Sequence, residues 1–275
     1  MALVAFGALI MRYMGNGPEW LGATVFYDLY CKRNWWINLL YLQNFVHQNE
    51  TCLTHTWYSA VDTQLYLLSP VFIILLYKMP KTAFALCFAI IAASIVGTWT
   101  LTVMNNYPAV SYFTDSITTQ QLVGYYNSIY TKPYFRVGPY LVGILAAYAM
   151  LENSFKNFNL KTWYLVTGWI LSLTTMAAII LALYPTHQGN ILEIHLAATY
   201  SAIARILWAC CLAWITFASQ QQKNIISAFL SLKIWVPVSK LTYCVYLVHP
   251  VIIAFFYGSQ TKPFDYSFLL MEMLY

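Results

Sequence analysis

Charge is what this sequence has least of. Only 8% of its 275 residues are Asp, Glu, Lys or Arg, whereas an ordinary soluble domain carries about 25%. So few charged groups cannot cover a water-exposed surface, and 60% of the residues are apolar. The shortage of charge also excludes a disordered chain, which combines low hydrophobicity with high net charge. The composition therefore predicts a membrane protein, whose partner is the lipid bilayer.

Runs of basic residues and cysteine pairs with C-x-x-C spacing are also missing. The net charge is +5, but the longest basic cluster is the pair Lys32 and Arg33. Nucleic-acid binding needs many phosphate contacts at once, so we expect no nucleic-acid partner. The chain holds no C-x-x-C pair, which argues against a zinc site. We expect neither a metal nor a bound cofactor.

Six long runs, each with at most one charged residue, are apolar enough to cross a bilayer, which takes about 20 residues. They cover residues 56–77, 83–103, 136–151, 162–184, 196–219 and 241–261. We expect an all-α fold, a polytopic bundle of six transmembrane helices. The apolar run over residues 2–11 is too short to cross. We expect it to be the end of a truncated N-terminal helix that begins upstream, and an interfacial segment is the alternative.

Loop charges predict the orientation of the bundle. The connections expected on one side hold seven lysines: Lys78, Lys81, Lys156, Lys161, Lys223, Lys233 and Lys240. That side is expected to be cytoplasmic, which makes the connections over residues 12–55 and 105–135 luminal or extracellular, in the plasma membrane or an endomembrane. Asn49 begins an N-x-T glycosylation acceptor in the first connection. Cys31 and Cys52 lie there too and can form a disulfide in an oxidising compartment.

Three ionisable residues fall inside predicted spans: Asp62, Arg205 and His249. Each costs about 2.5 to 3.5 kcal/mol at the centre of a membrane helix. Helix rise places them roughly 9 to 13 Å from the outer ends of their spans, in one layer. Either they line a polar cavity, or Arg205 neutralises Asp62 and the pair only holds helices together. Arg136 begins its span, where an arginine can reach water.

His249 has a neighbour that changes its surroundings. Pro250 lacks an amide hydrogen, so it should kink the helix and leave the carbonyl of Tyr246 without its backbone donor. One ring nitrogen of His249 could bond that carbonyl, which would leave the other nitrogen for proton transfer. The alternative is a histidine whose hydrogen bonds are satisfied within the bundle.

Three segments resemble motifs of the acyltransferase-3 membrane proteins. Residues 56–66, T-W-Y-S-A-V-D-T-Q-L-Y, resemble the T-W-S-L-x-V-E-x-Q-F-Y signature, with Asp62 at the position of the usual Glu. Residues 241–250, L-T-Y-C-V-Y-L-V-H-P, are similar to the S-Y-x-x-Y-L-x-H motif of the last helix. Residues 136–143 are similar to the R-x-x-x-x-x-x-G helix start. The segment from Cys31 looks like the C-x-x-x-W-W-x-N-L-L-Y of the animal branch called nose-resistant-to-fluoxetine-like proteins.

The resemblance covers nearly the whole chain and implies a single membrane domain, residues 1–275. It implies transfer of an acyl group, from a donor such as acyl-CoA, to a hydroxyl of a lipid, sugar or small molecule. It also implies that the first helix of the family, with the histidine taken as its base, lies upstream. With the intramembrane layer, it gives these candidate site residues: Asp62, Arg205 and His249 for catalysis, and Arg136, Gln64 and Tyr246 for substrate binding. The alternative is a non-catalytic transporter or a lipid- or xenobiotic-handling protein with the same fold.

Overall fold

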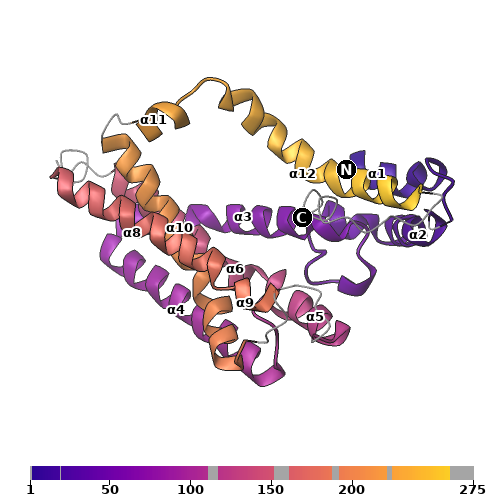
Figure 1. Ribbon diagram of the computed structural model, residues 1–275, viewed down its shortest axis with the longest axis horizontal. Helices are drawn as coiled ribbons and strands as arrows, with labels where there is room; N and C mark the ends of the chain where they lie inside the picture. The colour runs from indigo at the N-terminus through magenta and orange to yellow at the C-terminus, as the bar shows by residue number, and fades with distance from the viewer. Residues whose placement is uncertain are drawn as a thin grey trace. The chain divides into compact units, whose positions relative to one another are not determined.

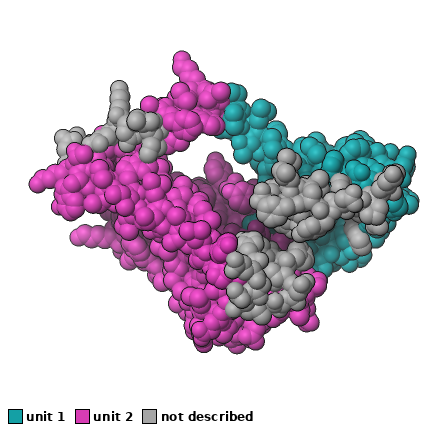
Figure 2. Space-filling model, viewed as in Figure 1, with its two compact units in different colours: residues 1–57, 236–275 teal, residues 58–235 magenta. Residues whose placement is uncertain are grey.

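The computed structural model of the chain describes residues 2–18, 20–110, 117–151, 161–187, 192–221 and 225–260. Over these ranges the chain forms helices and turns and no strand, which confirms the all-α fold. It divides into two compact units (Figure 2). Unit 1 is formed by residues 1–57 and 236–275, and unit 2 by residues 58–235.

Six helices among the described residues are long and apolar enough to cross a membrane, which confirms the expected spans. They are α3 (Trp57–Lys78), α4 (Pro80–Asn105), α6 (Pro133–Leu151), α8 (Thr162–Leu181), α10 (Ile194–Gln221) and α12 (Trp235–Gly258) (Figure 1). Helix α12 begins earlier than expected. Ser239 and Lys240 lower the local hydropathy, but neither interrupts a helix.

Unit 2 is built around α10, which packs against α4, α6 and α8, while α4 also packs against α6 (Figure 1). The side chains that α10 buries are mostly small: Ala197, Ala198, Ser201, Ala202, Ala204, Cys211 and Ala218. Small residues let membrane helices approach closely, since lipid supplies no hydrophobic force between them. Gly168 of α8 marks the tightest approach, because a Cβ at this position would collide with the indole ring of Trp214 on α10.

The connection expected over residues 12–55 holds a helix, α2 (Trp20–Leu39), which departs from helical geometry at Asn34 and packs against α1 (Ala2–Leu9) in unit 1. Its charged residues lower its mean hydropathy, so a search for apolar spans does not detect it. They also favour a helix, because Asp28 and Lys32 are one turn apart and pair, with Lys32 Nζ 2.6 Å from Asp28 Oδ1. The predicted connection therefore contains a helix, and the side of the membrane on which it lies stays a prediction.

Trp20 is the centre of the apolar core of unit 1. Its side chain is 1% exposed and packs with Met11 and with Val251 of α12. Its ring meets that of Phe255 edge to face, with 5.7 Å between the centroids. The indole Nε1 donates to the carbonyl of Arg12 at 3.0 Å, so the polar edge of the buried ring is also bonded.

The connection over residues 105–135 contains α5 (Thr119–Tyr125) and a π-helical turn (Tyr126–Tyr130). A capping box starts α5: the Thr118 hydroxyl accepts from the Gln121 amide, and the Gln121 side chain accepts from the Thr118 amide. The π-helical turn contacts α6, so the short helix and the turn position the tyrosines at their ends next to that helix.

Candidate functional site

The structure places His249 next to the carbonyl that Pro250 leaves without a backbone donor. His249 Nδ1 lies 2.7 Å from the carbonyl oxygen of Tyr246 and 3.3 Å from that of Val245. A carbonyl only accepts, so Nδ1 carries the proton in the neutral ring and Nε2 carries the lone pair. The expected bond is therefore present. The helix is continuous across Pro250, and the kink stays a prediction.

Helix α3 also contains a proline, Pro70, and a different residue bonds the carbonyl that this proline leaves without a backbone donor. Ser69, which precedes Pro70, donates its hydroxyl to the carbonyl of Tyr66 at 2.7 Å. A donor just before the proline thus satisfies the freed carbonyl in both helices. What distinguishes His249 from Ser69 is that the histidine keeps a second, basic nitrogen after making this bond.

His55 completes a cluster that sequence reasoning missed. Its Nε2 lies 3.2 Å from the carbonyl of Leu247, and its ring centroid is 6.3 Å from that of His249. Tyr246 donates its hydroxyl to the carbonyl of His55. We call His55, Tyr246 and His249 the histidine cluster. The sequence signal for His55 is weak: it directly precedes the signature that begins at Thr56, and its partner Leu247 is 192 residues away.

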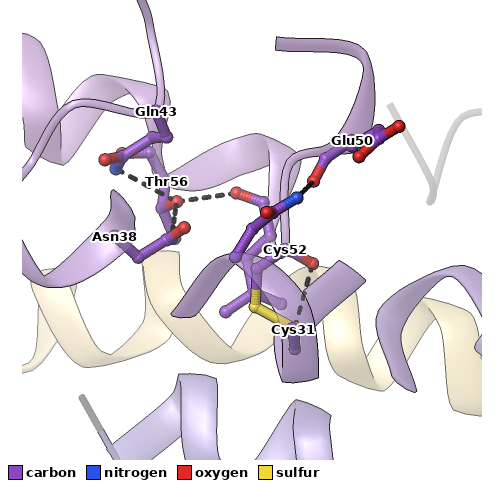
Figure 3. The surroundings of a disulfide bond; sticks show 8 residues. Cys31, Asn38, Gln43, Glu50, Cys52 and Thr56 are labelled. Atoms are coloured by element: carbon purple, nitrogen blue, oxygen red, sulfur yellow. Dashed lines mark hydrogen bonds between the residues drawn. A yellow bond between two sulfur atoms is a disulfide. The ribbon is translucent and has the colours of Figure 1, made fainter. Parts of the chain in front are cut away.

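The disulfide expected between Cys31 and Cys52 is present and ties α2 to the segment that carries His55 (Figure 3). It is buried together with Val4 and Leu53. Asn49 lies within the 21-residue separation of the two cysteines, and its side chain is exposed. Exposure is what a glycan acceptor requires, and glycosylation of Asn49 stays a prediction.

Thr56 fixes the backbone directly after His55. Its hydroxyl donates to the carbonyl of Leu53 at 2.6 Å and accepts from Asn38 Nδ2 at 3.0 Å (Figure 3). Gln43 Nε2 donates to the Thr56 carbonyl at 3.0 Å. All three polar side chains are buried. The polar network therefore fixes the backbone on the C-terminal side of His55.

A second cluster, in unit 2, joins two of the predicted site residues. Arg136 Nε donates to the carbonyl of Tyr130 at 2.9 Å, and its guanidinium carbon lies 4.4 Å from the centroid of the Tyr130 ring. The guanidinium carbon of Arg205 lies 5.7 Å from the same centroid. Arg205 Nη2 also donates to the hydroxyl of Tyr125 at 2.8 Å. We call Arg136, Arg205, Tyr125 and Tyr130 the arginine cluster.

Asp62 and Gln64 both lie in α3. Asp62 is exposed, and the described part of the chain offers it no hydrogen bond or ion pair. Arg205 bonds Tyr125 rather than Asp62, so a neutralising pair between them is not formed. Gln64 is half-buried. The structure thus joins Arg136 with Arg205 and Tyr246 with His249, and the common layer of Asp62, Arg205 and His249 stays a prediction.

Metal ligands do not gather in the described ranges: no group of three or more His, Cys, Asp or Glu residues there could hold an ion. The histidine cluster accordingly offers two imidazoles and a phenol. These groups can accept, donate and relay protons.

Comparison with known proteins gives the family. The family described as "Acyltransferase domain" matches residues 2–271. "Nose resistant to fluoxetine protein 6" of Caenorhabditis elegans is 28% identical over 99% of this chain, and "Regulator of hypoxia-inducible factor 1" of the same organism is 29% identical over 52%. The chain covers 34% and 30% of these two relatives, about a third of each. No solved structure matches it. With six helices that can span a bilayer, the chain belongs to the acyltransferase-3 family and is a multi-pass membrane protein.

Proposed function

We propose that the protein transfers an acyl group within the membrane, from a donor such as acyl-CoA to a hydroxyl of a lipid, sugar or small molecule. His249, rather than the histidine that the resemblance places upstream, acts as the general base, and His55 and Tyr246 hold it in place. The family supports the reaction class. The chain is about a third of its curated relatives, so the proposal concerns the part that this chain contributes to the reaction.

The observation that carries the proposal is the hydrogen bond from His249 Nδ1 to the Tyr246 carbonyl. It fixes the tautomer and turns Nε2 away from the backbone of its own helix. A general base needs a lone pair within reach of the substrate proton, and Nε2 of the neutral imidazole carries one. Asp62, Arg205, Arg136 and Gln64 stay in the proposal as residues near the donor or acceptor, without an assigned step.

The acceptor oxygen attacks the thioester carbonyl carbon while Nε2 of His249 takes the hydroxyl proton. The tetrahedral intermediate then collapses with cleavage of the carbon–sulfur bond. The imidazolium returns its proton to the leaving thiolate, which gives an ester and a free thiol.

The test uses the longest form of the protein that its gene encodes, reconstituted in liposomes of total membrane lipid. Radiolabelled acetyl-CoA and palmitoyl-CoA are the donors, and both new ester and released thiol are measured. His249→Gln should lower turnover about 10²- to 10⁴-fold, because glutamine can still donate to the Tyr246 carbonyl but offers no base. His195→Gln is the matched control, since His195 is exposed and stacks on Trp99 at 5.8 Å.

Undiminished turnover in a folded His249→Gln protein would remove His249 from the reaction. Transport of labelled lipid across the liposome without ester formation would instead favour the transporter or lipid-handling alternative.

A further inference from the structure

Two positively charged side chains from different helices of unit 2 share one aromatic ring. Arg136 comes from α6 and Arg205 from α10, and their guanidinium carbons lie 4.4 Å and 5.7 Å from the Tyr130 centroid. Each distance is measured to the same point, so the two carbons are at most about 10 Å apart. The face of an aromatic ring attracts cations but does not neutralise them. Two like charges this close in an apolar segment repel each other unless an anion lies near both.

Arg205 has no such anion among the described residues. Its described hydrogen bond goes to the neutral hydroxyl of Tyr125, and no described ion pair includes it. The side chain is only half-buried, so part of it is accessible to a ligand.

Tyr125 supplies an additional donor. A guanidinium group has no lone pair, so the Tyr125 oxygen must accept from Arg205 and keeps its own hydrogen for another acceptor. The described part of the chain provides no acceptor for that hydrogen, although Tyr125 is fully buried. A buried hydroxyl hydrogen without an acceptor is costly, and an oxygen atom of a ligand would satisfy it.

We propose that the arginine cluster binds a phosphate group, held between the guanidinium groups of Arg136 and Arg205 and the hydroxyl of Tyr125. Phosphate fits because its oxygens can take bidentate bonds from arginine and accept from a hydroxyl at once. Arg136 is the fourth residue of α6, about 5 Å along the helix from its first residue. Helix α6 is long and apolar enough to span a membrane, and lipid headgroups lie at the ends of such spans. The phosphate can thus belong to a lipid headgroup or to a soluble phosphate ester. Binding here is separable from acyl transfer, because its readout needs no turnover.

The full chain is purified in dodecyl maltoside, a detergent that contains no phosphate. The melting temperature of the protein is then measured with added ligands. Phosphatidylglycerol should raise the melting temperature, and diacylglycerol, which has similar acyl chains but no phosphate, should not. Inorganic phosphate and glycerol phosphate form the soluble arm. A response to them identifies a soluble ester as sufficient, and a response to phosphatidylglycerol alone identifies the lipid headgroup.

Variants locate the site. Arg205→Gln and Arg136→Gln should each weaken phosphatidylglycerol binding roughly tenfold or more, because each removes charge-assisted bonds. Tyr125→Phe removes only the hydroxyl and keeps the ring, so it tests the site if an arginine variant does not fold. Arg33→Gln is the matched control, since the Arg33 side chain is 69% exposed and lies in unit 1.

A carboxylate of the chain is the competing occupant. Asp62→Asn tests the carboxylate in α3, and Asp115→Asn tests one that lies outside the described residues. The proposal expects both variants to respond to phosphatidylglycerol as the parent does. Three results would overturn it: equal stabilisation by diacylglycerol, an unchanged response in Arg205→Gln and Tyr125→Phe, or a response that appears only after an aspartate has been removed.

Discussion

Replacing Thr56 with valine removes one hydroxyl from the buried network behind His55 while keeping the shape of the side chain. The hydroxyl accepts from Asn38 Nδ2 at 3.0 Å and donates to the Leu53 carbonyl at 2.6 Å. Asn38 is 5% exposed, and its Oδ1 already has no partner in the described structure. After the substitution its amide nitrogen would be unbonded as well. Gln43 keeps its bond to the Thr56 carbonyl.

The expected cost follows from these groups. Leaving a buried donor or acceptor without a partner costs about 1 to 3 kcal/mol, so we expect a loss of about 2 kcal/mol in the free energy of unfolding. A domain of this size loses about 2 to 4 °C per kcal/mol, so the melting temperature should fall by roughly 4 to 8 °C. Tryptophan fluorescence of the full chain in detergent micelles measures this change.

Thr24→Val is the matched control for this substitution. Thr24 is also buried in unit 1, but its hydroxyl donates only to the carbonyl of Trp20 one turn earlier in the same helix, at 2.7 Å. Its loss should cost well under the 2 kcal/mol expected for Thr56→Val, about 1 kcal/mol or less. Adding Asn38→Leu to Thr56→Val should recover part of the loss, since both partners are then apolar. Equal melting temperatures for Thr56→Val and Thr24→Val would refute the reasoning.

Two further predictions concern helix packing and pH. Gly168→Ala should lower stability by about 1 to 3 kcal/mol, because its Cβ would collide with Trp214, whereas Gly143→Ala in the open part of α6 should be neutral or stabilising. Thermal unfolding of both variants checks this, and equal effects would contradict it. The hydrogen bond and the charge of Lys32 hold the pKa of Asp28 below its ordinary value. This pairing stabilises the fold above the unfolded pKa near 3.9 and is lost as pH falls through the folded pKa. Asp28→Asn should therefore cost up to about 1 kcal/mol at pH 7 and nothing near pH 2, and a pH-independent difference would count against it.

The spans could be predicted from the sequence because a membrane helix can be recognised from its apolar composition alone. Residues 83–103 and 162–184 hold no charge, and α4 and α8 form there. Helix α2 lacks that signal. Asp28 and Lys32 give it the composition of a connection, and only their spacing of one turn indicates a helix.

The immediate surroundings of His249 were equally predictable, since Pro250 decides locally which carbonyl loses its donor. The approach of His55 was not, because 192 residues separate His55 from Leu247 in the sequence. Residues so distant in sequence leave no periodicity or spacing to detect.

The arginine cluster could be predicted from the sequence only in part. Arg136 and Arg205 stood out as charges in or at the edge of apolar runs, but no sequence pattern showed that Tyr130 would lie beside both. The short helix α5 and the turn after it bring the ring there. Charge balance suggested Asp62 as the partner of Arg205, and a phenol took that place instead.

The proposed role of His249 requires that it keep its proton on Nδ1 and present Nε2 as the acceptor. Nitrogen-15 NMR of the full chain with labelled histidine in lipid nanodiscs, above the imidazole pKa, measures this directly. The chain has 5 histidines, and the spectrum of His249→Gln identifies the signals of His249 by difference. We predict a protonated Nδ1 and an unprotonated Nε2. A proton on Nε2, or a signal averaged over both tautomers as in free imidazole, would contradict the account.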